Sequence, residues 1–248
     1  MSYKSVVPIA GVDGLSLAFV PDVKQRFALG AIVAAIDPYW GGGEFEYVYS
    51  NDALAQGSLV SIVSTFDAPN ARWRREAKLA ANVANKGSSL GVALAAGGVG
   101  TYAWVMVAGL AIVASAASVA ADTAFGIGGI GQGGALAAGK QVLNARVAVA
   151  ATATVIKPSV ASISVGAAGQ SYIGVQNSDG WFVGMALTGT GIGAAAKINS
   201  ISQDGTVIGV SVVNAAAVVG SITGTYNDGT IFYNVCEINR PFQQGAIT

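Results

Sequence analysis

Two glycine-rich stretches come closest to known ligand-binding motifs. Residues 126–131, "GIGGIG", have the G-x-G-x-x-G spacing with which a dinucleotide-binding loop approaches a pyrophosphate. That site also needs an acid about 20 residues later to bind the ribose, and no Asp or Glu occurs between Asp122 and Asp179. Residues 134–141, "GALAAGKQ", approach a phosphate-binding loop, but Gln141 replaces the hydroxyl that would hold magnesium. We therefore interpret both stretches as loops of a glycine-rich chain.

The chain lacks the residues that nucleophilic and metal-dependent catalysis require. It contains no histidine and a single cysteine, Cys236. Ser-His and Cys-His systems need an imidazole base, and metal sites need clustered His, Cys or carboxylates. The closest carboxylate pair, Glu44 and Glu46, is expected on one strand face toward solvent, and Cys236 is expected to be a small buried apolar residue. We predict a non-enzymatic protein with no catalytic residue, no metal site and no cofactor.

One segment is markedly basic. Residues 70–87, "NARWRREAKLAANVANKG", oppose one acid, Glu76, with five basic residues: Arg72, Arg74, Arg75, Lys78 and Lys86. Such a run is either a solvated face or a contact patch for a phosphate backbone or an acidic protein surface. Because Trp73 is its only stacking aromatic, we expect no direct nucleic-acid binding.

The longest uncharged run, between Lys86 and Asp122, covers most of residues 101–125 and raises the question of a membrane span. The run is long enough, because about 20 apolar residues cross a bilayer as a helix. Its large side chains, however, recur at every second position from Tyr102 through Trp104 and Met106. That period is typical of a β-strand, with the larger set filling a core and the smaller set packing under a second layer. Since Lys/Arg anchors are also missing from the flanks, we expect no membrane span.

Composition and turn residues outline the domains. Charged residues make up 10% of the chain and apolar residues 52%, with 34 glycines, which favours many short packed strands and a surface covered in an assembly. We expect an all-β chain: an extended N-terminal arm over 1–26, a barrel- or sandwich-like main β domain over 27–157, a small β-sandwich module over 158–226, and a segment over 227–248 that returns to the main domain. The N-terminus lacks a secretory signal, so we expect synthesis in the cytoplasm.

The order of several strand and turn sequences resembles capsid decoration, or cement, proteins of tailed bacteriophages. The resemblance is carried by "LGAIVAAIDPYWGGGEFEYVYSNDALAQGSLVSI", "GTYAWVMVAG" with "ASVAADTAF", "GWFVGMALTGTGIGAAAKINSISQDGTVIGVSV" and "INRPFQQGAIT". It implies a virion protein on the outer surface of an icosahedral head that clamps neighbouring major capsid proteins and has no active site. Partners would be the major capsid protein and further copies of the chain.

Two further expectations follow for assembly and contact. The sparse charge predicts an obligate homo-oligomer, with a trimer on a local threefold as first choice and a dimer as second. Arg72, Arg74, Arg75, Lys78 and Lys86 become candidate capsid contacts.

A receptor- or glycan-binding module of a head or tail fibre is the alternative function. Its binding tip would be residues 158–226, where Trp181, Tyr172 and Tyr226 could stack on sugars. We favour core packing for all three. Copy number separates the two functions, because cement proteins occur in hundreds of copies per particle and fibres in tens.

Overall fold

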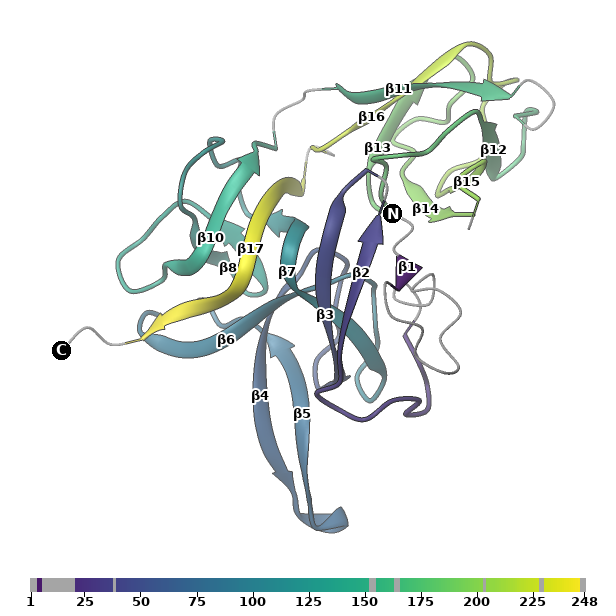
Figure 1. The fold of residues 1–248 in the computed structure, drawn as a ribbon. Coiled ribbons are helices and arrows are strands. Elements are labelled where there is room, and N and C mark those ends of the chain that lie inside the picture. Colours follow the sequence, from purple (N-terminus) through teal and green to yellow (C-terminus); the bar gives the residue numbers. More distant parts are fainter. Residues whose placement is uncertain are drawn as a thin grey trace. The chain divides into compact units, whose positions relative to one another are not determined.

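The structure is a computed structural model that describes residues 4–5, 21–37, 39–151, 155–162, 166–202, 204–227 and 230–245, with the backbone alone described for 4–5 and 155–162. The fold is all-β, as expected. Two compact units are present: a main unit that holds the described residues up to Ile36, 41–151 and from Ile231 onward, and a small unit that holds 37–40 and 152–230 (Figure 1).

Five strands of the main unit close into a barrel. They are β3 (Gly41–Ser50), β4 (Leu59–Asp67), β5 (Arg72–Leu79), β6 (Lys86–Ala93) and β7 (Tyr102–Ser115). β3 pairs in parallel with β5, and the antiparallel pairs β5–β4, β4–β6, β6–β7 and β7–β3 complete the ring. The inward-pointing side chains form one buried cluster: Val48, Leu54, Val60, Ile62, Ala77, Ala93, Val105 and Val107. Within the ring itself, each strand is paired on both edges.

Both faces of β7 are buried, which explains the long uncharged run. Val105 and Val107 point into the barrel, whereas Trp104 packs outside it against Tyr47 at 5.0 Å and Phe27 at 5.4 Å between ring centroids. The expected strand is thus confirmed, and Trp104 and Met106 of the larger set are buried in a core. The smaller set is buried as well, with Val105 and Val107 inside the barrel. Among the described residues, no helix is long and apolar enough to cross a membrane.

Residues 21–30 cover the outer face of β3 and β7. The backbone of Asp22 pairs with Tyr102, the Tyr47 hydroxyl donates to the Asp22 carboxylate at 2.8 Å, and the Arg26 N–H donates to the Tyr47 oxygen at 3.2 Å. Of the expected arm, therefore, residues 21–26 lie on the main unit, and β1 (Lys4–Ser5) pairs with β2 (Ile32–Asp37). The rest of the arm lies outside the described residues.

The C-terminal strand joins the two halves of the main unit. β17 (Phe232–Gly245) pairs with β7 up to Asn239 and with β6 from Phe242, so it changes partner around Arg240. Its other edge carries β10 (Val142–Val149), and the hairpin of β8 (Gly126–Gly129) and β9 (Gln132–Gly134) extends the sheet beyond β7. The "GIGGIG" stretch forms β8 and the turn of this hairpin, and strand β9 follows it where a dinucleotide loop would need a helix. The structure therefore excludes a dinucleotide loop at this position.

The small unit is a six-stranded sheet in the order β13-β16-β11-β12-β15-β14. Its strands are β11 (Val155–Ser162), β12 (Tyr172–Val175), β13 (Ala186–Gly189), β14 (Ile198–Ile201), β15 (Val207–Val210) and β16 (Ser221–Thr225). An isolated bridge between Ala186 and Lys197 brings the ends of the sheet together. Trp181 and Tyr226 are buried, as we favoured, whereas Tyr172 is 42% exposed.

Candidate functional site

The β4–β5 hairpin extends beyond the barrel. β4 pairs with β6 only through Leu59 to Ile62, but it continues to pair with β5 as far as Asp67 opposite Arg72. A short 3₁₀ turn, Ala68–Asn70, closes the hairpin. The outer half of the hairpin therefore has no third strand beside it among the described residues, and Figure 1 shows it projecting from the main unit.

Two aromatic side chains are exposed at the tip of this hairpin. Phe66 and Trp73 are cross-strand neighbours whose ring centroids lie 5.6 Å apart in an edge-to-face arrangement. Their side chains are 51% and 71% exposed, respectively. The pair was not predicted from the sequence, because neither strand alone determines the register that places Phe66 opposite Trp73.

Most of the basic candidates are already paired with carboxylates of the same chain. The Arg74 guanidinium donates to Glu76 at 2.8 Å through Nε, and Lys78 lies 3.6 Å from the same carboxylate. Burial of Arg74 alone would lower its pKa, but the hydrogen bond and charge of Glu76 outweigh burial and raise it. Arg74 also lies over the Tyr49 ring, 3.9 Å from its centroid.

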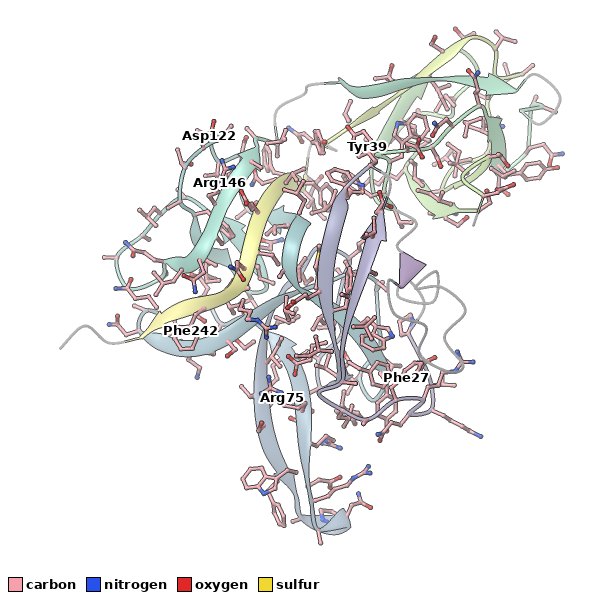
Figure 2. All side chains as sticks on the ribbon, viewed as in Figure 1. Phe27, Tyr39, Arg75, Asp122, Arg146 and Phe242 are labelled. Carbon is pink, nitrogen blue, oxygen red and sulfur yellow. The ribbon has the colours of Figure 1, made fainter. Side chains whose placement is uncertain are left out.

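Arg75 pairs with a carboxylate that we expected in solvent. Arg75 lies on β5, and its Nε donates to the carboxylate of Glu46 on the neighbouring strand β3 at 2.7 Å. Glu46 is only 7% exposed, so the expectation that it faces solvent is wrong. Glu46 shares a strand face with Val48 and lies at the mouth of the barrel, where Arg75 offsets its desolvation. Figure 2 labels Arg75 at the root of the projecting hairpin.

The two remaining candidates are far apart on the main unit. Arg72 lies at the hairpin tip, 3.9 Å from Asp67, and its side chain is half exposed. Lys86 opens β6, opposite Gly245 of β17, and has no ion pair among the described residues. The five basic residues predicted as capsid contacts thus do not form one continuous patch.

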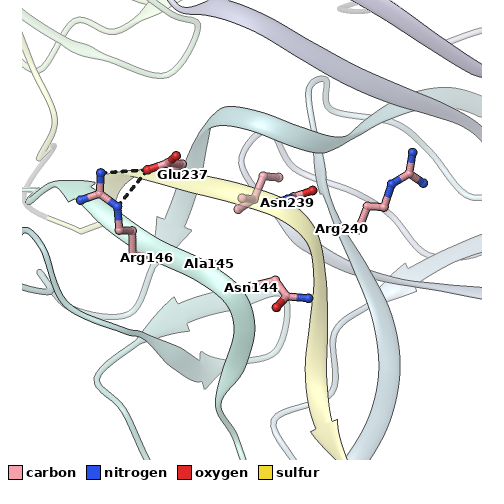
Figure 3. A pocket seen from close by; sticks show the side chains of 7 residues that line it. Asn144, Ala145, Arg146, Glu237, Asn239 and Arg240 are labelled. Carbon is pink, nitrogen blue, oxygen red and sulfur yellow. Dashed lines mark hydrogen bonds and ion pairs between the residues drawn. The ribbon is translucent and has the colours of Figure 1, made fainter.

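A polar pocket of about 690 Å³ opens where β10 and β17 separate (Figure 3). Leu143 pairs with Phe242 and Ala145 pairs with Ile238, so the register between the two strands shifts at this point. The shift lies where β17 moves from β7 to β6. Non-glycine residues take up the irregularity at positive φ, with Asn144 at 57° and Arg240 at 49°. Such bulges often re-aim side chains at functional sites.

The charged groups of this pocket are mutually satisfied. Arg146 binds Glu237 at 2.8 Å and also Asp122, whereas Arg240 reaches Glu44 at 2.6 Å. No group of His, Cys, Asp or Glu in the described part of the chain could hold a metal ion. The charged side chains around the pocket are therefore held in ion pairs within the chain.

A shallow apolar groove of about 270 Å³ lies between β2, β3 and β7. Its walls are the exposed face of β2, with Ala34 and Ile36, and a strip of small residues: Gly42, Gly43, Ala108 and Gly109. Glu44 lies at its edge. Of its glycines, Gly42 faces open space, because a carbon added there would have no atom within 4 Å, whereas a carbon added at Gly43 or Gly109 would meet Met106 at 2.6 Å.

No family model, no curated protein and no solved structure matches this chain.

Proposed function

We propose that this chain is a decoration protein of a tailed bacteriophage head, which binds the outer capsid surface and clamps neighbouring major capsid proteins. The observation that carries the proposal is that large apolar side chains are exposed at several separate places on the main unit. Large apolar side chains are exposed at the hairpin tip, on β2, on β10 and β17, and in loops: Phe66, Trp73, Ile32, Ile36, Leu143, Phe242, Val99 and Ile130.

Several separate patches suit a lattice subunit. A subunit of a shell has several neighbours, and each contact removes apolar surface from water, whereas a module that binds one receptor concentrates such residues at one site. The low proportion of charged residues, 10%, has the same implication, because uncharged surface is tolerated best where assembly covers it. The resemblance of the strand and turn sequences to decoration proteins supports a phage head as the shell to which this subunit binds.

Because the same contact is repeated over the capsid lattice, weak individual contacts are sufficient for stable binding. A subunit that touches two or three capsomers at once converts the second contact into an intramolecular step, so that modest single contacts give high avidity. The fibre alternative is supported less, since two of its three candidate stacking residues, Trp181 and Tyr226, are buried.

The test is the copy number and position of the protein in purified phage particles. Quantitative mass spectrometry should find hundreds of copies per particle, in a fixed ratio to the major capsid protein, and antibody labelling should mark the heads. Tens of copies, or labelling of tails alone, would support the fibre function instead. Absence from purified particles would refute both.

A further inference from the structure

We propose that the free edge of strand β4 binds an extended segment of the major capsid protein, which adds to the β4–β5 hairpin as a further strand. The choice of partner rests on the proposed function. β6 pairs with β4 only up to Ile62, which lies opposite Ser89. Lys86 and Ser88, at the start of β6, pair with β17 instead. Because β4 continues to Asp67, its outer half has no neighbour on this edge in the part of the chain that the structure describes (Figure 1).

The backbone groups on this free edge belong to Ser64 and Phe66. In an antiparallel ladder, successive residues of a strand direct their N–H and C=O groups to opposite edges. The Ala93 N–H of β6 donates to the Ser58 carbonyl at 2.9 Å, just before β4 begins, so residues of even number face the edge that β6 occupies. The register to β5 continues without a shift to Asp67, and Ser64 and Phe66 therefore face the same edge beyond the end of the β6 pairing. Their N–H and C=O groups are the ladder positions that an added strand would fill.

The free edge of β4 lacks the devices with which proteins usually protect an edge strand. Residues 63–66, "VSTF", contain neither a charge nor a proline, whereas exposed edges are commonly blunted by one or the other. The opposite edge of the hairpin, on β5, is spanned by two arginines: Arg75 reaches Glu46 on β3 at 2.7 Å, and Arg74 lies over the Tyr49 ring. An added strand is therefore expected on β4 and not on β5.

Side chains of the added strand would meet two different surfaces. Ile62, Ser64 and Phe66 lie on one face of β4, because alternate residues of a strand do so. Phe66 forms the exposed aromatic pair with Trp73 at the outer end of this face. At its inner end, Ile62 and Leu90 line the pocket of about 160 Å³ at the barrel mouth, and a cavity of about 150 Å³ holds a group the size of benzene. The partner segment should carry an apolar side chain opposite Phe66 and, two residues away, a second side chain that reaches the pocket.

The size of this surface suits a capsid segment better than a second copy of the chain. Phe66 and Trp73 bury about 300–500 Å² when fully covered, well below the roughly 1,200 Å² at which specific stable interfaces begin. A dimer held by this edge alone would therefore be weak. On a phage head, the other exposed apolar places of the main unit contribute at the same time, so a small contact is sufficient.

Hydrogen–deuterium exchange tests strand addition directly. The wild-type chain is compared free in solution and bound to phage heads that have been stripped of it, and exchange is resolved to single amides by mass spectrometry. We expect the Ser64 and Phe66 amides to exchange at least about tenfold more slowly on the heads, because a ladder hydrogen bond protects an amide. The Trp73 amide, which faces the other edge of the hairpin, should exchange at the same rate in both states. Equal protection of all three would show burial of the tip without strand pairing and would overturn the proposal.

A proline substitution tests the same edge by removing a donor. Ser64→Pro removes one N–H of the free edge and leaves the ladder between β4 and β5 intact. We expect at least about tenfold weaker binding to stripped heads, since a lost hydrogen bond with a buried partner costs about 1–3 kcal/mol. Ala138→Pro is the matched control and should bind like the wild type. Ala138 is the second residue of an exposed turn in which Lys140 donates to Ala137 and Gly139 has a φ of 70°, and such turns favour proline at that position.

Circular dichroism and thermal melting verify that both proline variants are folded. Unchanged binding of a folded Ser64→Pro variant would overturn the proposal, and if this variant does not fold, the exchange measurement on the wild type decides. Failure of the wild type to bind stripped heads would refute the proposed function, and strand addition with it. Binding without protection of Ser64 and Phe66 would refute strand addition alone. Protection of these amides in the free protein, with twice the 24.7 kDa chain mass, would place a second copy on the edge and would also overturn the proposal.

Discussion

At the scale of single residues, burial determines the reactivity of the single cysteine, Cys236. Cys236 is 1% exposed on β17, and desolvation raises the pKa of its thiol well above the ordinary value. Thiolate is the reactive form, so a buried, protonated cysteine is inert. The interpretation of Cys236 as a small buried residue is confirmed.

This leads to a prediction on thiol reactivity. An aromatic disulfide reagent should leave Cys236 of the folded protein unmodified, and raising the pH from 7 to 9 should not change this, although it ionises an ordinary thiol with a pKa of about 8.5. In denaturant one thiol per chain should react at once. Rapid reaction of the folded protein would show that β17 opens readily or that Cys236 is accessible.

At the scale of elements, β7 and residues 21–30 stabilise each other. Trp104 is 4% exposed and lies between the barrel wall and Phe27, which residues 21–30 provide. The same segment is fixed by Asp22, whose carboxylate accepts the Tyr47 hydroxyl. Burial of Tyr47 raises its pKa, and the adjacent carboxylate of Asp22 adds to the effect, so the phenol stays a donor.

We predict that Trp104→Ala lowers the free energy of unfolding by about 3–5 kcal/mol, the cost of removing a large aromatic from a packed site. Trp73→Ala is the matched control, since an exposed tryptophan should change the monomer's stability by less than about 0.5 kcal/mol. Denaturant titration of the wild type and both variants, at the same protein concentration, measures the two effects. Equal effects of the two substitutions would contradict the packing of Trp104.

At the scale of the whole molecule, charge is expected to have a limited part in binding to heads. Glu76 partly neutralises Arg74 and Lys78, and Glu46 partly neutralises Arg75. The electrostatic potential that these three side chains present to a partner is therefore reduced. Exposed charges without a close partner are screened by salt over about 8–10 Å. In the proposed binding to heads, Lys86, and Arg72 with only a distant carboxylate, would therefore provide the salt-sensitive contribution.

We predict that salt weakens rebinding of the protein to stripped heads only moderately. The double variant Arg72→Gln/Lys86→Gln should flatten the dependence of affinity on salt, whereas Lys24→Gln, at another exposed position, should leave the slope unchanged. A slope that the double variant retains would mean that other groups make the electrostatic contact.

The sequence by itself determined the class of fold. Period-two alternation identified the strand that became β3 and showed that residues 101–113 form a strand rather than a membrane helix. It could do so because successive side chains of a strand point to opposite faces whatever surrounds them. The turn residues predicted a small module over 158–226, and the structure has a compact unit that holds 152–230 together with 37–40.

Only the tertiary structure decided which surfaces are buried and which are free. Parallel pairing of β3 with β5 brings Glu46 to Arg75, 29 residues away, and turns an apparent solvent carboxylate into a buried partner. Projection of the hairpin past β6 leaves Phe66 and Trp73 exposed, although their residue types are typical of a core. The physical reason is the same in both cases. Alternation is a local property of the backbone, whereas burial depends on neighbours that are distant in the sequence, and strand register places them.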